Sequence, residues 1–219
     1  MAPELDQLAI EDEKRAAGEA AALLVEDGMT VGLGTGSTVA YLLPALAARG
    51  LTLRCVATSV GTEEQARSAG LPVEPFEGIA RLDIAIDGAD QIAPDGWIVK
   101  GGGAAHTREK VVAASSDRFV VIASSDKLVE TIAPPIPLEL LAYGLDATLV
   151  RLGEVELRDV PPSPDGGVIA DYLGPVEDPA AVAAWLSATA GVVDHGLFPP
   201  ELTSDVLVGR GEEVERLAL

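Results

Sequence analysis

Short apolar segments alternate with helix-like segments along residues 5–124, and this alternation limits the possible folds more than any other feature of the chain. Strands are expected at 29–34, 51–58, 82–86, 96–100 and 118–124, and helices at 5–27, 35–50 (after a loop), 61–70 and 104–115. In the helix at 61–70, Thr62 and Gln65 have the spacing of a capping box. Strands that alternate with helices are typical of parallel βαβ units, in which helices cover both faces of one sheet. We therefore expect an α/β domain.

The pattern changes at about residue 133. The segment APPIP at 133–137 resembles a linker, because proline stops helices and strands alike. Beyond it, strands are expected at 138–143, 154–160, 166–173 and 191–198, and helices at 144–153 and 178–189. This β-α-β-β-α-β order is that of a ferredoxin-like α+β unit. A further strand at 204–211 could return to the first sheet, so we expect domains at 1–133 with 204–219, and at 134–203.

The composition excludes several classes of partner. The formal net charge is -20, from 35 acidic and 15 basic residues, and such a surface repels nucleic acid and anionic membranes. No apolar run approaches the length of a membrane span, and the charged first 21 residues do not resemble a signal peptide. The single cysteine, Cys55, leaves no internal disulfide. We expect a cytoplasmic, acidic protein that binds neither nucleic acid nor membrane.

The unusual residues follow the expected strands. In parallel sheets, ligands bind at the carboxyl ends of the strands. The segments that follow strands here are 34–38, 58–62, 87–91, 100–103 and 124–127. These segments are therefore the candidate binding site.

The first of them lies in GLGTGSTV, residues 32–39. Glycines let several backbone N–H groups point at one anion, and a helix N-terminus and hydroxyl groups add to this. The segment is not a P-loop, because no Gly-Lys-Ser/Thr follows, and it is not a G-x-G-x-x-G fingerprint, because its third glycine comes one residue early. A phosphate site at Thr35, Gly36, Ser37 and Thr38 and a plain tight turn both fit the pattern. For Thr58, Ser59 and Thr62 we expect plain helix capping.

The segment DGADQI places Asp87 and Asp90 at the end of an apolar strand. Two carboxylates there could act as acid and base or orient hydroxyl groups, although Asp-Gly is also common in turns. The chain has two histidines, His106 and His195, and neither has ligand spacing to another. We expect no metal site, and we interpret both histidines as structural or surface residues.

The segment KGGGAAHTREK, residues 100–110, adds the remaining groups. Three consecutive glycines let a small ligand lie against main-chain N–H groups, and Lys100 could neutralise an oxyanion. Glu109 could point back to the glycines, and a carboxylate in a closed pocket can have a raised pKa and remove a proton from carbon. Lys127 fits a phosphate partner and a solvated lysine equally well.

Together these segments, with SSDKLV at 124–129, closely resemble ribose-5-phosphate isomerases of the A type over nearly the whole chain. The resemblance implies a Rossmann-like α/β/α main domain with the smaller ferredoxin-like domain. It also implies interconversion of ribose 5-phosphate and ribulose 5-phosphate in the non-oxidative pentose phosphate pathway, with no cofactor, in a homodimer or a tetramer. Implied substrate contacts are Thr35, Gly36, Ser37, Thr38, Asp87, Gly88, Ala89, Asp90, Lys100, Gly101, Gly102, Gly103 and Lys127; Lys14 matches a lysine of the family's first helix.

The resemblance implies that Glu109 is the base, which moves a proton from C2 to C1 of the open-chain sugar. Lys100 would stabilise the enediolate, Asp87 would exchange the protons of ring opening, and Asp90 would orient hydroxyl groups. Gln91, His106 and the linker depart from the family pattern, but no proposed catalytic residue is replaced.

Three other functions remain open. An amino-sugar phosphate deaminase would share the fold, but the glycine triplet with Glu109 argues against it. A non-catalytic sugar-phosphate sensor could lack Glu109 or Lys100, and both are present. A nicotinamide-dependent oxidoreductase would be expected to carry the standard glycine fingerprint, which is missing.

Overall fold

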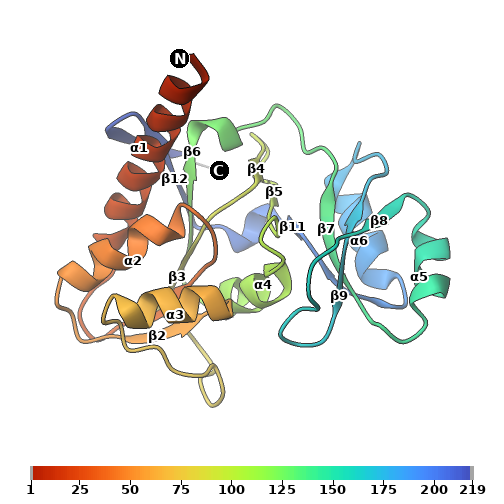
Figure 1. The fold of residues 1–219 in the computed structure, drawn as a ribbon, viewed down its shortest axis with the longest axis horizontal. Coiled ribbons are helices and arrows are strands. Elements are labelled where there is room, and N and C mark those ends of the chain that lie inside the picture. Colours follow the sequence, from red (N-terminus) through yellow and green to blue (C-terminus); the bar gives the residue numbers. More distant parts are fainter. Residues whose placement is uncertain (1, 218–219) are drawn as a thin grey trace.

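A computed structural model describes residues 2–217 of the chain, as one larger and one smaller part (Figure 1). The larger part is built on a six-stranded sheet in the order β13-β12-β6-β3-β1-β2. Its strands are β1 (Thr30–Leu33), β2 (Arg54–Ala57), β3 (Ile84–Asp87), β6 (Phe119–Ser124), β12 (Asp205–Arg210) and β13 (Glu213–Leu217). Every neighbouring pair is parallel except β12 with β13. The predicted α/β class with a main parallel sheet is confirmed.

Helices cover both faces of this sheet, because its strands bury alternate residues on opposite sides. The helices are α1 (Ala2–Ala22), α2 (Val39–Ala48), α3 (Val60–Ser68) and α4 (His106–Ala114). On one face, Leu33 and Ile122 pack among apolar residues of α1, α2 and α3. On the other face, Phe119 and Val121 pack with α4. The sheet is thus buried on both sides, as βαβ units require.

The order of the strands decides where a ligand can bind. Successive connections run from β1 outward to β2 and then back across β1 to β3, so the direction of winding reverses between β1 and β3. In doubly wound sheets, a crevice opens at the carboxyl ends of the strands at this reversal. The loops after β1 and β3 therefore meet at one place.

A short three-stranded antiparallel sheet lies beside the main one. It contains β4 (Gln91–Ile92), β5 (Ile98–Val99) and β11 (Leu197–Phe198), in the order β11-β5-β4. The strand predicted at 96–100 is therefore present, but it does not join the parallel sheet. One-turn helices, η1 (Ser125–Lys127) and η2 (Pro200–Leu202), follow β6 and β11.

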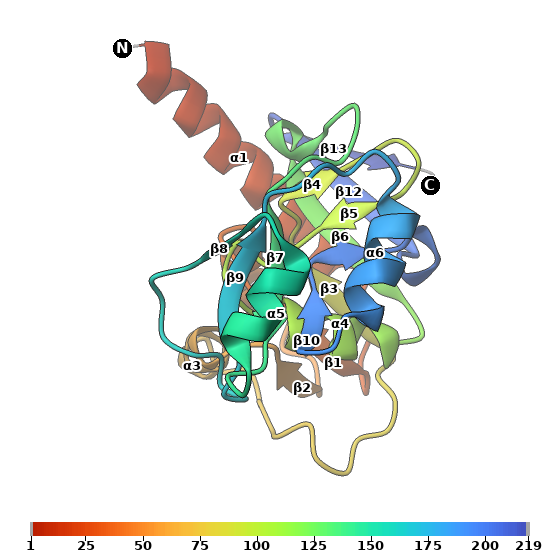
Figure 2. The same ribbon diagram turned by 90° about the vertical axis from the view of Figure 1, so that its right-hand side faces the viewer.

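The smaller part has the β-α-β-β-α-β order that the sequence predicts. Its elements are β7 (Ile136–Leu140), α5 (Leu145–Leu152), β8 (Val155–Leu157), β9 (Val168–Tyr172), α6 (Pro179–Ala188) and β10 (Val192–His195). The sheet is antiparallel, in the order β10-β7-β9-β8, and α5 and α6 lie against it (Figure 2). Its apolar core also takes in Val99 of β5 and Leu197 of β11. The fold class is confirmed, whereas the domain boundaries at 133 and 203 remain a prediction.

Five details of the predicted elements are wrong. β7 begins at Ile136 and contains Pro137, so the predicted linker at 133–137 is partly strand. α1 ends at Ala22 rather than near residue 27, because the chain turns at Leu23 and buries Val25 against the sheet. Ser59, not Thr62, caps α3, by accepting a hydrogen bond from the Thr62 N–H. The segment 191–198 forms two strands in different sheets, separated at Gly196, where a Cβ would meet the Lys100 carbonyl at 2.2 Å. The edge strand β13 was not expected.

No helix among residues 2–217 is long and apolar enough to cross a membrane.

Candidate active site

A small cavity of about 130 Å³ lies where the loops after β1 and β3 meet. All of its lining residues belong to the predicted site: Thr35, Gly36, Ser37, Thr38, Gly88, Ala89, Asp90, Lys100, Gly101, Gly102, Gly103, Glu109 and Lys127. The remaining predicted residue, Asp87, is not in the lining and is only 2 % exposed. Residues up to 92 positions apart in sequence, from Thr35 to Lys127, therefore line one cavity.

The loop after β1 curls closely around the end of β3. A Cβ on Gly34 would lie 2.0 Å from Asp87 Cγ, so only glycine fits this approach. The Thr35 N–H donates to Asp87 Oδ1 at 3.0 Å, and the Gly88 N–H donates to the same oxygen at 2.7 Å. Asp87 thereby ties the two loops together.

Hydroxyl groups at and just before the start of α3 hold Thr35 in place. Thr35 Oγ1 lies 2.8 Å from the hydroxyls of Thr58 and Ser59 and 3.1 Å from that of Thr62. We expected these residues to cap a helix. Ser59 does so, but all three also support the candidate phosphate loop, a role that only their spatial proximity to Thr35 reveals. Beyond this loop α2 begins at Val39, with its N-terminus next to the cavity-lining Thr38.

Lys100 and two carboxylates form a buried charged cluster beside the cavity. Lys100 Nζ lies 3.1 Å from Asp87 Oδ2 and 3.4 Å from Glu109 Oε2, and it donates to the Gly88 carbonyl at 2.6 Å. Lys100 is 2 % exposed and Glu109 is 3 % exposed. Two carboxylates share one ammonium, so the fully ionised cluster would carry an excess negative charge away from water.

This imbalance shifts the acid–base properties of the cluster. Burial, reinforced by the charge of Asp87, raises the pKa of Glu109 to about 8, although Lys100 opposes the shift. Burial also raises the pKa of Asp87 against the opposing effect of Lys100. Burial alone would lower the pKa of Lys100, but Asp87 and Glu109 outweigh it and raise that pKa. Glu109 can therefore exchange a proton near neutral pH.

The glycine triplet forms a tight loop before α4. Gly101 has a φ of +107°, and Ala104 has a φ of 59°, a conformation in which residues other than glycine are uncommon. The Gly102 N–H donates to Asp90 Oδ2 at 2.7 Å, and a Cβ on Gly102 would lie 2.7 Å from Asp90 Oδ1. Asp90 is thus held against the loop by a backbone approach that a larger residue would prevent.

The two remaining lysines of interest differ in position. Lys127 lies in η1 after β6, lines the cavity, and has its ammonium 3.0 Å from Asp126. Lys14 lies on α1, pairs with Glu11 at 2.7 Å, and is not in the lining.

Both histidines are buried, and burial lowers the pKa of each to about 3. Neutral His195 accepts the Leu197 N–H at Nδ1, which favours the structural interpretation. Among residues 2–217, no group of three or more His, Cys, Asp or Glu side chains is placed to hold a metal ion.

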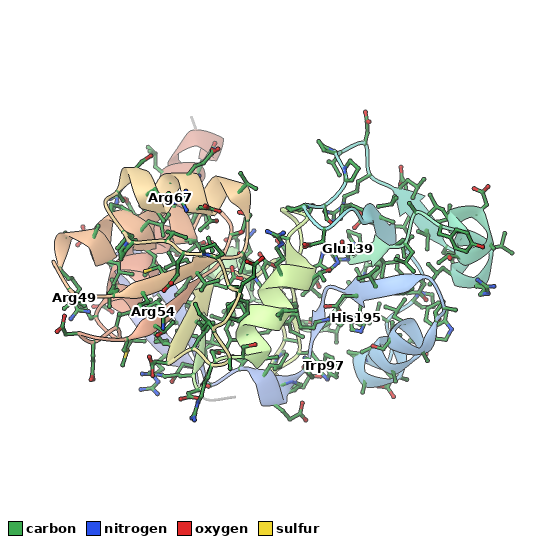
Figure 3. The ribbon with its side chains drawn as sticks, turned by 90° about the horizontal axis from the view of Figure 1, so that it is seen from below. Arg49, Arg54, Arg67, Trp97, Glu139 and His195 are labelled. Atoms are coloured by element: carbon green, nitrogen blue, oxygen red, sulfur yellow. The ribbon has the colours of Figure 1, made fainter. Side chains whose placement is uncertain are left out.

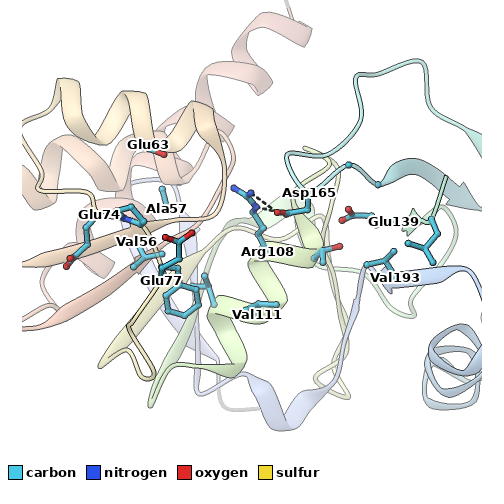
Figure 4. A pocket seen from close by; sticks show the side chains of 17 residues that line it. Val56, Ala57, Glu63, Glu74, Glu77, Arg108, Val111, Glu139, Asp165 and Val193 are labelled. Carbon is cyan, nitrogen blue, oxygen red and sulfur yellow. Dashed lines mark hydrogen bonds and ion pairs between the residues drawn. The ribbon is translucent and has the colours of Figure 1, made fainter. Parts of the chain in front are cut away.

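A larger cleft of about 740 Å³ opens on another side of α4 (Figure 4). Its charged lining consists of Glu63, Glu74, Glu77, Arg108, Glu139 and Asp165. Arg108 is already paired with Asp165, at 2.6 and 2.8 Å. An anionic sugar phosphate would meet an excess of carboxylates there, so the smaller cavity is the better candidate.

The chain is similar to known proteins over most of its length. The family model described as ribose 5-phosphate isomerase A (phosphoriboisomerase A) matches residues 54–213. Ribose-5-phosphate isomerase A of Caulobacter vibrioides is 45 % identical, over 96 % of this chain and 99 % of its own length. That of Halobacterium salinarum is 48 % identical, over 85 % and 88 %.

Solved structures of ribose-5-phosphate isomerases also superimpose closely on this chain. Ribose 5 phosphate isomerase A of Neisseria gonorrhoeae superimposes with a TM-score of 0.90 at 29 % identity, covering 95 % of this chain and 96 % of that one. A D-ribose-5-phosphate isomerase in complex with phospho-erythronic acid superimposes with a TM-score of 0.89 at 30 % identity, covering 96 % and 99 %.

Proposed function

The chain belongs to the ribose-5-phosphate isomerase A family and interconverts ribose 5-phosphate and ribulose 5-phosphate in the pentose phosphate pathway, and we propose that it does so through an enediolate with Glu109 as the base. One observation carries the proposal: a buried carboxyl whose pKa is about 8 lies 3.4 Å from a buried lysine at a small polar cavity. A base is most effective when its pKa lies near the working pH.

The reaction begins with ring opening, in which Asp87 exchanges the protons and Asp90 orients the hydroxyl groups. Burial raises the pKa of Asp87, so its carboxylate takes up a proton more readily than an ordinary aspartate does. The open chain then presents the C1 aldehyde and the C2 hydrogen to Lys100 and Glu109.

Glu109 removes the hydrogen from C2, and the electron pair moves to O1. A proton passes from O2 to O1, and Glu109 returns its own proton to C1, which gives the ketose. Lys100 and the N–H groups of the glycine loop stabilise the negative charge on O1 and O2. Because these donors are held before the reaction starts, little reorganisation is needed at the transition state.

The phosphate group lies against the loop at 35–38 and Lys127. Support comes from the glycine-rich turn, the N-terminus of α2 and the ammonium of Lys127 at the same cavity. Binding energy from this end holds the sugar in register with Glu109.

The relative that binds phospho-erythronic acid gives a suitable probe. That compound has a phosphate and a planar carboxylate, which spreads its charge over two oxygens as an enediolate does. We propose that it binds this chain in the same cavity, with the carboxylate at Lys100 and the glycine loop.

We also propose that residues 1–133 and 204–219 form the catalytic domain and that 134–203 form the smaller one. The strands β7 to β10 support this division, since among residues 2–217 they pair only with each other. Assembly as a homodimer or tetramer and a cytoplasmic location are further proposals. Tyr143 and Val150, which are strongly exposed, are apolar groups that such an assembly could cover. Sedimentation velocity tests the assembly.

The mechanism is tested by running the reaction in D₂O after EDTA treatment and without a nicotinamide cofactor. The proton that Glu109 takes from C2 can exchange with solvent before Glu109 returns it to C1, so part of the ribulose 5-phosphate should carry deuterium at C1. Turnover in D₂O should be the same with and without EDTA treatment. A product free of deuterium even after long incubation with the enzyme would favour hydride transfer, and loss of turnover with EDTA would indicate a metal.

A further inference from the structure

Arg158 of the smaller part reaches the glycine loop of the active site. Its side chain, which follows β8, forms a two-pronged ion pair with Asp171 of β9, at 2.7 Å (Nε to Oδ2) and 2.6 Å (Nη2 to Oδ1). The remaining nitrogen, Nη1, donates to the carbonyls of Gly101 at 2.7 Å and Gly102 at 3.2 Å. Both side chains are 18 % exposed, so the pair is largely shielded from water.

These contacts determine which way the loop amides point. In a trans peptide, the C=O and the N–H of one unit point in opposite directions. The Gly101 carbonyl belongs to the same peptide unit as the Gly102 N–H, and the Gly102 carbonyl belongs to that of the Gly103 N–H. When Arg158 holds both carbonyls on its side, both amides are directed to the opposite side. The Gly102 N–H there meets Asp90, which lines the cavity.

The loop needs such an anchor. Its conformation includes positive φ angles at Gly101 and at Ala104, and strained backbone persists only where the surroundings fix it. The Gly101 carbonyl accepts from the Ala104 N–H at 2.9 Å as well as from Arg158. A lysine could not take the place of Arg158, because its single ammonium lacks the planar guanidinium geometry that binds Asp171 and two carbonyls at the same time.

We propose that Arg158 is a positioning residue for the isomerase reaction and that Asp171 keeps it in place. The pair comes from the smaller part of the chain, yet it holds the Gly102 amide on Asp90 and directs the Gly103 amide toward the enediolate. The inference rests on the proposed role of the glycine loop. It assigns to β8 and β9 a function in catalysis, although no residue of either strand lines the cavity.

The test compares Arg158→Ala, Arg158→Lys and Asp171→Asn with the wild type. The control is Asp165→Asn, which breaks the ion pair that joins the same part of the chain to Arg108 of α4 without touching the glycine loop. For each variant we measure kcat, KM, the melting temperature, and inhibition by phospho-erythronic acid and by inorganic phosphate.

A misdirected loop should impair the transition state more than the substrate complex. For Arg158→Ala we expect kcat to fall about 100-fold, the loss typical of misplacing a group by about 1 Å, with KM changed less than about threefold. Inhibition by phospho-erythronic acid should weaken strongly, while that by inorganic phosphate is unchanged. Arg158→Lys and Asp171→Asn should show smaller losses of the same kind, and Asp165→Asn should match the wild type.

Three results would overturn the inference. The first is a kcat within about threefold of the wild type in all Arg158 and Asp171 variants. The second is a loss of kcat in Asp165→Asn as large as that in Arg158→Ala. The third is that Arg158→Ala weakens inhibition by phospho-erythronic acid and by inorganic phosphate equally. If Arg158→Ala does not fold, the other two variants decide. Turnover retained by Glu109→Gln would instead overturn the proposed function, so the two failures are distinguishable.

Discussion

A buried lysine and a half-buried one lie near the same aromatic ring but in different electrostatic surroundings. Lys100 Nζ lies 5.7 Å from the centre of the Phe198 ring, and Lys110 Nζ lies 5.1 Å from it. Lys100 faces two carboxylates, Asp87 and Glu109. Lys110 pairs with one, Asp194, at 2.6 Å, and also donates to the His195 carbonyl. Figure 3 shows His195 where the two parts of the chain meet.

The two surroundings differ by one negative charge and in how deeply they are buried. Around Lys110 the charges balance, and burial lowers the pKa of this lysine even though Asp194 opposes the shift. Around Lys100, burial raises the pKa of Glu109 to about 8, and the charge of the second carboxylate, Asp87, reinforces this shift. Burial is also deeper at the first cluster, where Lys100 and Glu109 are 2 % and 3 % exposed, than at the second, where Lys110 and Asp194 are both 18 % exposed. We infer that deep burial and the charge imbalance together produce a group able to transfer protons near neutral pH.

The largest effect is expected from Glu109→Gln, which removes the base and the imbalance together. The variant should lose about 10³-fold in kcat, within the range for general acid–base groups, and retain its fold and its affinity for ribose 5-phosphate. A coupled assay of ribulose 5-phosphate formation measures the rate. Turnover above about a tenth of the wild type would remove Glu109 from its role.

A direct contrast comes from replacing each lysine by methionine. Lys100→Met should lower kcat about 10²-fold, because it removes a charge that stabilises the enediolate. Lys110→Met should change kcat less than about threefold, since Lys110 does not line the cavity. Equal losses in the two variants would show that the clusters do not differ in function.

Lys110→Met should instead affect stability. It leaves Asp194 partly buried without its ammonium, which we expect to cost about 2 kcal/mol in the free energy of unfolding. Urea denaturation measures the loss, and the double variant with Asp194→Asn should recover part of it. If the double variant were less stable than Lys110→Met, the pairing of these two residues would not explain the cost.

A further effect on stability is a pH-dependent gain for Glu109→Gln. The pKa of Glu109 is higher in the folded chain, about 8, than its ordinary value of 4.5. Its contribution to stability is therefore complete below about pH 4.5 and is lost as the pH rises toward 8. Melting temperatures should show the variant gaining on the wild type over this range. A constant difference between the two would contradict the raised pKa.

The sequence predicts the cavity well because its signals are local. Glycines that follow apolar strands indicate close backbone approaches, as at Gly34 against Asp87. Parallel strands then bring such loops to one edge of the sheet. For these physical reasons the predicted positions from Thr35 to Lys127 meet at one cavity.

The sequence does not predict interactions that depend on how distant elements pack. Arg158 lies 57 positions from Gly101, and its contact depends on how β8 and β9 pack against the larger part. The hydroxyl contacts of Thr58 and Thr62 with Thr35 likewise require α3 in place. The balance between burial and Lys100 at Glu109 could not be settled without coordinates either.

The central claim is that the charge of Asp87 helps to hold the pKa of Glu109 high. The most direct test is the pH dependence of kcat/KM for the wild type and for Asp87→Asn, because this quantity reports the essential groups of the free enzyme. The wild-type rate should rise through a pKa of about 8. In Asp87→Asn the rise should move down by about one pH unit or more, whatever the loss in absolute rate. A rise that stays in place or moves upward would contradict the account.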